Sequence, residues 1–151
     1  MIAYLDSSVI LRVVLGQPER LGEWSAVTAG VASGLVEVEC LRTLDRLRLE
    51  GLLADEDLAV RRETVYRVLE ELELVEPTTP VLRRASQPMP TALGTLDAIH
   101  LATALLWREA RESDLIMATH DHALATAARA TGLRVVGTGV TFTHPVLGGT
   151  S

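Results

Sequence analysis

This chain contains no lysine, and all fourteen of its Lys and Arg positions are arginine. This absence excludes chemistry that needs a lysine side chain, such as that of a phosphate-loop nucleotidase or a Schiff-base enzyme. Cysteine is almost as scarce, and Cys40 is the only one. A single thiol can form no disulfide within the chain, and it cannot supply a zinc site built from several thiolates.

Long apolar runs and aromatic residues are rare as well. No run approaches the roughly eighteen residues that a membrane-spanning helix needs. Residues 1–6 also lack the basic stretch and the long apolar stretch of a secretory signal. We therefore expect a cytoplasmic protein that does not enter a membrane. Aromatic residues make up only 3% of the chain, so the core must consist of Leu, Val, Ile and Ala.

The charge of the chain is negative. Its 151 residues are the length of one domain, and the formal net charge is −6 with a pI of about 5.2. Taken alone, this acidity argues against a nucleic-acid partner, because phosphate binding usually requires a basic surface.

Segments typical of strands alternate with segments typical of helices. Apolar runs predict strands at residues 2–5, 30–32, 72–75, 115–118 and 134–136. Apolar spacing, capping residues and stop residues predict helices at 9–15, 19–27, 33–50, 55–72, 81–86, 96–110 and 123–130. This alternation predicts an α/β fold with a mainly parallel central sheet. We place one domain at residues 1–137 and a loosely structured Gly- and Thr-rich tail at 138–151.

Three aspartates fall at one predicted edge of this sheet. Asp6 follows the first strand, and Asp121 follows the strand that ends at Ala118. Asp97 lies in the first turn of its helix, where free N–H groups and the helix dipole favour a carboxylate. Ligands bind at the carboxyl ends of parallel strands, and helices of α/β units begin at the same edge. We therefore expect these aspartates to lie close together.

Glu39 is the fourth candidate for this acidic site. It lies one to two turns into the helix that begins at Ser33, between the apolar residues Val38 and Cys40. A glutamate on a solvated helix face would have more polar neighbours. An ordinary salt bridge to Arg42, three residues further along the helix, is the alternative explanation.

Each aspartate also has an ordinary explanation when it is taken alone. Asp6 and Asp121 both precede a helix and could serve only as N-caps, and Asp97 could serve only to stabilise a first turn. Their shared edge favours a joint role. Crowded carboxylates repel one another, and Mg²⁺ or Mn²⁺ would relieve this repulsion, activate a water molecule and bridge the acidic pocket to a phosphodiester.

Four segments resemble, in order, the four motifs of PIN domains. They are residues 4–8 (YLDSS), 33–42 (SGLVEVECLR), 96–104 (LDAIHLATA) and 118–121 (ATHD), the last followed by Leu124 and 127–133. The resemblance covers residues 2 to about 137, and the wording of the motifs is most similar to VapC toxins. It implies a three-layer α/β/α domain.

The resemblance also implies a function and a set of site residues. The acidic quartet would be Asp6, Glu39, Asp97 and Asp121, and the three aspartates would hold the metal. The hydroxyl groups of Ser7 and Thr119 would support the quartet. VapC-like proteins are Mg²⁺- or Mn²⁺-dependent endoribonucleases of toxin–antitoxin pairs, so the expected partners are an RNA substrate, a VapB-like antitoxin that places a basic side chain in the acidic pocket, and a second copy in a homodimer.

Several neighbouring residues need a separate decision. Glu37 is the alternative to Glu39 as the acid of this helix, but its spacing to Ser33 and Arg42 departs from the motif. Side chains two positions apart on a helix point in directions that differ by roughly 200°, so Glu37 and Glu39 cannot both face the site. Arg42 and Arg46 are candidates for RNA contact or for pairing with acids. His100 lies one turn after Asp97, and we expect it to form a structural hydrogen bond within the fold rather than to act in the site.

The remaining candidates are less informative. Cys40 is expected to be a buried packing residue rather than a nucleophile, and His120 is given no role. Two other functions stay open from the residues alone. One is a catalytically silent module that binds RNA or a protein. The other is a metal-dependent phosphoesterase that acts on DNA or on a small phosphate ester, because no motif in the chain reads the 2′-hydroxyl of RNA.

Overall fold

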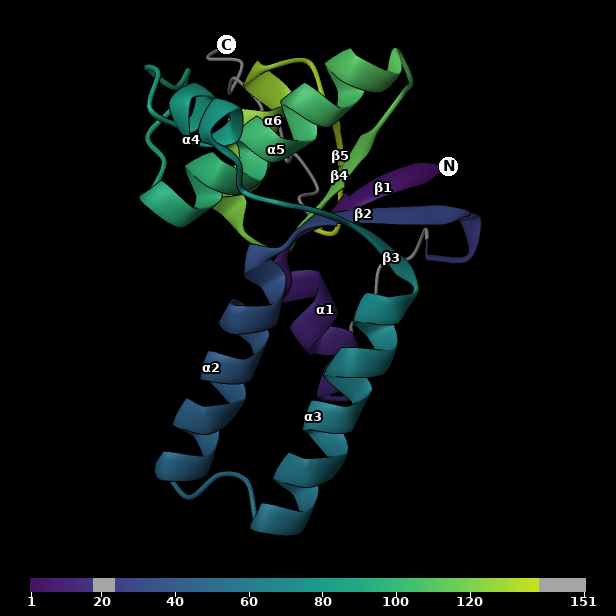
Figure 1. Ribbon diagram of the computed structural model, residues 1–151, viewed down its shortest axis with the longest axis vertical. Coiled ribbons are helices and arrows are strands. Elements are labelled where there is room, and N and C mark those ends of the chain that lie inside the picture. The colour runs from purple at the N-terminus through teal and green to yellow at the C-terminus, as the bar shows by residue number, and fades with distance from the viewer. Residues whose placement is uncertain (18–23, 139–151) are drawn as a thin grey trace, which may run out of the picture.

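A five-stranded parallel sheet forms the centre of the computed structural model, which describes residues 1–17 and 24–138 (Figure 1). The strands lie in the order β3-β2-β1-β4-β5, and every neighbouring pair is parallel. Their bounds are β1 Ile2–Leu5, β2 Ala29–Ser33, β3 Leu72–Val75, β4 Ile116–Ala118 and β5 Arg134–Val136.

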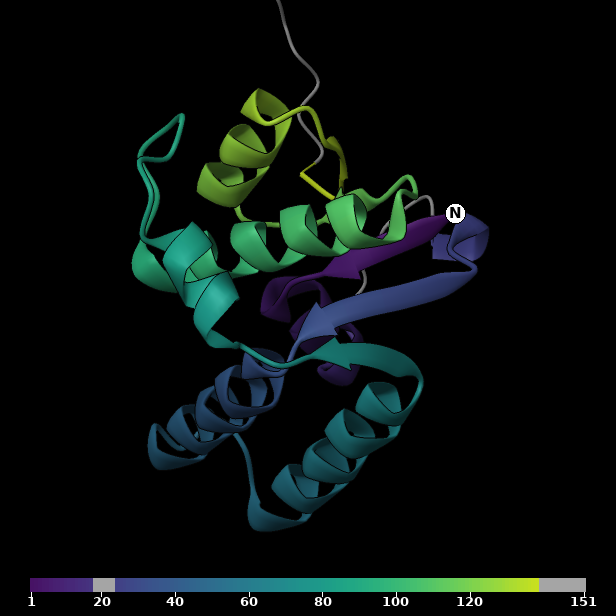
Figure 2. The same cartoon turned by 45° about the horizontal axis from the view of Figure 1, so that its top comes forward.

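Helices cover both faces of this sheet. One face carries α1, α2 and α3, and the opposite face carries α4, α5 and α6 (Figures 1 and 2). Their bounds are α1 Ser7–Val14, α2 Leu35–Leu49, α3 Asp55–Glu70, α4 Thr79–Ala85, α5 Thr95–Arg111 and α6 His122–Ala130. The predicted three-layer α/β/α architecture with a parallel sheet is therefore confirmed.

Alternation along β1 divides the core into two layers. Ala3 and Leu5 are buried against the side chains of α1, α2 and α3. Tyr4, which points to the other face, is buried against α5 and α6. Successive strand residues point to opposite faces, so four residues of a central strand are enough to join both layers. Apolar burial on both sides is typical of parallel sheets.

Most elements that the sequence predicts are present. All five strands are confirmed within two residues, and Gly51 ends the long helix α2 with a left-handed backbone conformation at φ 74° that glycine adopts without strain. Helix α5 begins at Thr95, one residue before its predicted start at residue 96, and Gly94 is its N-cap residue.

The predicted helix at residues 19–27 is wrong at its described end. Residues 24–26 form a short 3₁₀ helix, and Val27 is not helical. Residues 19–23 lie outside the described part of the chain, and so does nearly all of the predicted tail, from residue 139 onward. Among the described residues, no helix is long and apolar enough to span a membrane.

The strand order determines where a site can form. From β1 the chain proceeds to β2 and β3 on one side, and it later returns to β4 and β5 on the other side. Ligands of parallel α/β sheets bind beyond the carboxyl ends of the strands where this order reverses. Here that place lies between the ends of β1 and β4, which Asp6 and Thr119 follow directly.

Candidate active site

Asp6 lies at the junction of β1 and α1 and is almost fully buried, with 3% of its surface exposed. Its Oδ1 accepts hydrogen bonds from the hydroxyl of Ser8 at 2.6 Å and from the backbone N–H of Val9 at 3.3 Å. Its Oδ2 accepts a hydrogen bond from the hydroxyl of Thr119 at 2.6 Å. Burial raises the pKa of Asp6, and the hydrogen bonds from Ser8 and Thr119 partly oppose that rise.

Thr119 connects Asp6 to Asp121. Its hydroxyl donates to Asp6 and accepts a hydrogen bond from the backbone N–H of Asp121 at 3.0 Å. Asp121 caps α6, because its Oδ1 accepts a hydrogen bond from the N–H of Leu124 at 2.9 Å. Both aspartates are therefore N-caps, as the ordinary explanation required, and they also share one buried threonine.

Glu39 is held by side chains from two other helices. The hydroxyl of Ser7 in α1 donates to its Oε2 at 3.2 Å, and Nε2 of His100 in α5 lies 2.6 Å from its Oε1. On the far side of the imidazole ring, the hydroxyl of Tyr4 lies 2.7 Å from Nδ1 of His100. The contact between His100 and Glu39 places His100 in this cluster, beyond the purely structural hydrogen bond expected for it.

Asp97 shows most clearly how crowded the acids are. It lies in the first turn of α5 and is partly buried. The pKa of Asp97 is raised to about 6, first by burial and then by the charges of Asp121, Asp6 and Glu39, while His100 acts in the opposite direction. The first turn of a helix normally favours an ionised carboxylate, so burial and neighbouring acids outweigh the helix dipole here.

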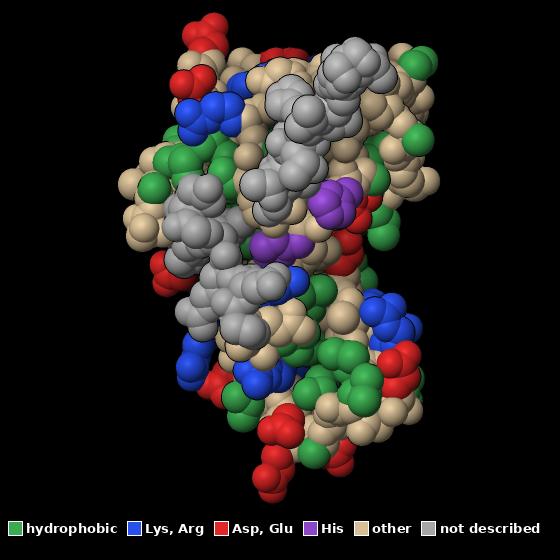
Figure 3. All heavy atoms as spheres, turned by 180° about the vertical axis from the view of Figure 1, so that it is seen from behind, with side chains coloured by type: hydrophobic (Ala, Val, Ile, Leu, Met, Phe, Trp, Pro, Cys, Tyr) green, Lys and Arg blue, Asp and Glu red, His purple; other side chains and the backbone are tan. Residues whose placement is uncertain are grey.

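The structure thus brings Asp6, Glu39, Asp97 and Asp121 to one edge of the sheet, as predicted. They come from the β1–α1 junction, α2, α5 and the β4–α6 junction. Acidic and histidine side chains lie next to one another near the narrowest part of the rear surface (Figure 3). That these four acids carry out catalysis stays a prediction.

The competing assignments on α2 are separated by their surroundings. Glu37 is exposed, whereas Glu39 contacts Ser7 and His100. Among the described side chains, Arg42 pairs with Asp45 at 3.4 Å rather than with Glu39. Arg46 is exposed on the same helix, so contact of either arginine with RNA stays a prediction.

Three residues of the cluster were missed or undervalued by the sequence interpretation. Tyr4 was assigned only to a strand, yet its hydroxyl faces His100. Ser8 donates to Asp6 and accepts a hydrogen bond from the N–H of His120 at 3.0 Å, so it joins the two strand ends. Only the spacing of His100 from Asp97, one helical turn, gave a signal in the sequence.

Other candidates behave as ordinary structural residues. Cys40 is fully buried in the core, as predicted, and burial raises the pKa of its thiol to about 12, which opposes a nucleophilic thiolate. Nδ1–H of His120 donates a hydrogen bond to the carbonyl oxygen of Gly137 at 2.6 Å, because a carbonyl oxygen can only accept.

The acids suit a divalent cation in chemistry but do not enclose one. Within the described residues, no three acidic, histidine or cysteine side chains converge closely enough to hold a metal ion. Mg²⁺ is usually bound by only one or two carboxylates and keeps several water ligands. Burial and the charges of neighbouring carboxylates raise the pKa of Asp97, and such a cation would offset the repulsion among these acids.

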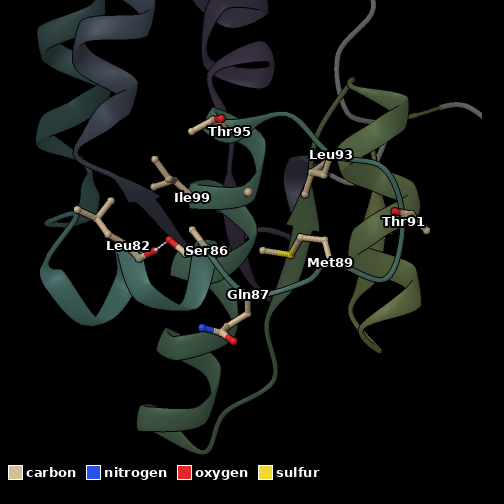
Figure 4. A pocket seen from close by; sticks show the side chains of 10 residues that line it. Leu82, Ser86, Gln87, Met89, Thr91, Leu93, Thr95 and Ile99 are labelled. Atoms are coloured by element: carbon tan, nitrogen blue, oxygen red, sulfur yellow. Dashed lines mark hydrogen bonds between the residues drawn. The ribbon is translucent and has the colours of Figure 1, made fainter.

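A separate hollow lies between α4, α5 and the loop that joins them. Its volume is about 520 Å³, and Leu82, Met89, Leu93 and Ile99 contribute to its apolar lining (Figure 4). Among the described residues that line it, none is acidic. It therefore offers a cation no carboxylate ligand and is distinct from the acidic cluster.

Comparison with known families agrees with this architecture. The profile of the PIN domain matches residues 3–130. The chain therefore belongs to the PIN-domain family, and the family resemblance drawn from its four motifs is confirmed.

Two curated relatives from Mycobacterium tuberculosis match most of the chain. Ribonuclease VapC47 of strain CDC 1551 / Oshkosh is 30% identical over 129 residues, which cover 85% of this chain and 91% of the relative. Ribonuclease VapC46 of strain ATCC 25618 / H37Rv is 32% identical over 137 residues, which cover 88% and 95%.

Solved structures share the fold at lower sequence identity. A toxin–antitoxin complex from Klebsiella pneumoniae contains a chain with a TM-score of 0.63 and 17% identity, and the match covers 89% of this chain and 96% of that one. PAE2754 from Pyrobaculum aerophilum has a TM-score of 0.60 and 18% identity, with 91% of each chain covered. These matches support the three-layer fold.

Proposed function

We propose that this chain is a metal-dependent endoribonuclease, the toxin component of a toxin–antitoxin pair. Two curated relatives that match along nearly their whole length are named VapC ribonucleases. The chain carries the PIN domain over residues 3–130, and ribonucleases of this family generally depend on a divalent metal ion.

The crowding around Asp97 is the observation that carries the proposal. Its pKa of about 6 results from burial and from the carboxylates of Asp121, Asp6 and Glu39. Removal of the Asp97 carboxylate would relieve repulsion between like charges, so the stability of the fold does not explain an acid at this position. A site that binds a cation and a phosphodiester needs this negative charge.

Asp6, Asp97 and Asp121 would hold the metal ion, directly or through its bound water molecules, and the ion would be Mg²⁺ with Mn²⁺ as a substitute. When bound, the ion supplies charge neutralisation at the phosphate and a water molecule of lowered pKa. Thr119 fixes the orientation of Asp6 and the backbone of Asp121 through its two hydrogen bonds. The acidic pI of the chain argued against a nucleic-acid partner. A metal cation removes this objection, because it can bind the carboxylates and the phosphodiester, which are both negatively charged.

Glu39 completes the proposed site from the side of α2. Ser7 and His100 each hold one oxygen of its carboxylate, and both oxygens keep a free lone pair that can accept a further hydrogen bond. The side chain is 17% exposed. An anchored carboxylate can accept a proton from an attacking water molecule or orient that molecule. We assign Glu39 this role, and we assign binding of the metal to the three aspartates.

The proposed partners follow from the same chemistry. An antitoxin of the VapB kind would insert a basic side chain among the acids, since a guanidinium group pairs strongly with carboxylates. The active form would be a homodimer. Arg42, 74% exposed, and Arg46 would contact the phosphate backbone of the RNA.

RNA cleavage by the purified chain, free of antitoxin, tests this function. The assay uses mixed cellular RNA with Mg²⁺, with Mn²⁺ and with a chelator. Asp6→Asn is compared with Glu109→Gln, a matched control that neutralises an exposed acid near the far end of α5. We expect metal-dependent cleavage by the wild type and the control, and none by Asp6→Asn.

Full activity of a folded Asp6→Asn variant would contradict the site assignment. Cleavage that persists in chelator would contradict the metal. If the wild type binds Mn²⁺ but cleaves single-stranded DNA and no RNA, the phosphoesterase that acts on another substrate is correct instead. Absence of both metal binding and cleavage would favour the silent binding module.

A further inference from the structure

A line of hydrogen bonds connects the buried core to Glu39. Tyr4 lies on the central strand β1 and His100 on α5, and both are buried, with 0% and 1% of their surfaces exposed. The Tyr4 hydroxyl lies 2.7 Å from Nδ1 of His100, and Nε2 of the same ring lies 2.6 Å from Oε1 of Glu39. The imidazole therefore bridges a buried phenol and a partly exposed carboxylate.

The direction of these hydrogen bonds follows from the two outer groups. An ionised carboxylate can only accept, so Nε2 of His100 has to carry a hydrogen and donate it to Glu39. In the neutral ring Nδ1 is then an acceptor, and the Tyr4 hydroxyl donates to it.

We propose that His100 is a positioning residue for the reaction, which holds the Glu39 carboxylate in place from its Nε2 while Tyr4 fixes the imidazole tautomer from its Nδ1. The inference rests on the proposed function and assigns this residue a part in it. A tyrosine that sets the tautomer of a histidine corresponds to the outer hydrogen bonds that orient functional side chains in other sites.

The geometry explains why Glu39 needs such support. A glutamate side chain rotates about three bonds, and it loses much of this freedom when both of its oxygens are bound. Ser7 holds Oε2 at 3.2 Å, whereas His100 holds Oε1 at 2.6 Å. The shorter contact comes from a ring that is itself locked in the core, so His100 provides the more rigid of the two anchors.

Two substitutions of His100 separate positioning from packing. His100→Gln retains an amide N–H close to the place of Nε2, and His100→Leu fills similar volume without any donor. We expect His100→Leu to lower kcat about ten- to a hundredfold with KM nearly unchanged. His100→Gln should recover most of this loss. Equal kcat values in His100→Leu and the wild type would overturn the proposal.

A double-mutant cycle with Glu39→Gln tests whether His100 acts through Glu39. We expect His100→Leu to cause no further loss of kcat in the Glu39→Gln background, because the group that it positions is already gone. Losses that multiply in full would show that the two residues act independently, which contradicts the proposal. Thermal unfolding of each variant identifies any that fails to fold, and if His100→Leu does not fold, nitrogen NMR of the His100 ring decides instead.

Nitrogen NMR of the His100 ring provides a measurement that needs no activity. We expect a hydrogen on Nε2, an Nδ1 signal that moves in Tyr4→Phe, and an Nε2 signal that moves in Glu39→Gln. A ring with its hydrogen on Nδ1 alone would overturn the inference even if the chain cleaves RNA. If the wild type cleaves no RNA, the proposed function fails, and these signals still decide whether His100 holds Glu39.

Discussion

The two ends of α5 hold acids in opposite electrostatic surroundings. Near the start of the helix, burial and neighbouring carboxylates raise the pKa of Asp97 to about 6. Near its end, two hydrogen bonds from the Arg84 guanidinium, at 2.8 and 3.1 Å, lower the pKa of Glu109. The helix dipole alone would shift both groups the other way.

This difference shows which effect is larger. Charges at helix ends are worth typically 0.3–1 kcal/mol, about the size of an exposed ion pair. Desolvation and three nearby carboxylates overcome the dipole at Asp97, and one well-placed arginine overcomes it at Glu109. On this helix, Glu109 is paired with an arginine and contributes to stability. Asp97, which is proposed to serve function, stays surrounded by other carboxylates.

The largest expected contrast is in activity. Asp97→Asn should lower the proposed RNA cleavage at least about a hundredfold, because a carboxylate that helps to hold the metal contributes several kcal/mol to the transition state. Glu109→Gln should stay within about twofold of the wild type. Initial rates at saturating Mn²⁺ compare the two, and equal losses in both variants would remove the distinction between the ends of α5.

The response to metal should differ almost as strongly. Mn²⁺ at a hundred times its dissociation constant should stabilise the wild type by about 2.7 kcal/mol. The Glu109→Gln variant should respond equally, and Asp97→Asn much less. Thermal unfolding with and without Mn²⁺ measures this response, and a full response in Asp97→Asn would show that the ion binds elsewhere.

Stability without metal should change in the opposite direction from activity. The raised pKa of Asp97 corresponds to at most about 3 kcal/mol, and we expect about 1 kcal/mol, because the side chain is only partly buried and water screens its charge. Asp97→Asn should therefore unfold less easily than the wild type at pH 8. Urea unfolding in the presence of a chelator measures the difference, and a variant less stable than the wild type would argue against net repulsion.

The pH dependence of this gain has a definite sign. The pKa of Asp97 is raised in the folded state, so its stabilising contribution is complete below the unfolded value of 3.8 and is lost as the pH rises to about 6. The advantage of Asp97→Asn should accordingly shrink from pH 7 towards pH 4. A constant advantage over this range would mean that packing rather than charge is responsible.

The smallest effect is expected at Glu109. Its pKa is lowered in the folded state, so its contribution to stability is present above the unfolded value and is lost in acid, opposite to Asp97. Because the pair with Arg84 is exposed, Glu109→Gln should cost less than about 1 kcal/mol, and high salt should reduce the difference. Thermal midpoints at low and high salt would show this, and an unchanged difference would contradict an electrostatic origin.

Local patterns made much of the fold and of the candidate site predictable. Strand β1 and helix α5 were recognisable from apolar spacing over a few residues. The position of Asp6 at a strand end and of Asp97 in a first helical turn then placed both at one edge. The helix predicted at 19–27 is wrong at its described end, which forms only a short 3₁₀ helix. Short apolar segments specify helices weakly, and this explains the difference.

The sequence by itself determined the parallel α/β architecture, the family motifs and the edge at which Asp6, Glu39, Asp97 and Asp121 meet. Only the tertiary structure decided which donors reach them, because those partners are distant in the chain. Thr119 bonds to Asp6 across 113 positions, and His100 bonds to Glu39 across 61 and to Tyr4 across 96. Such contacts depend on how helices pack on the sheet, and no periodicity within a single element records that packing.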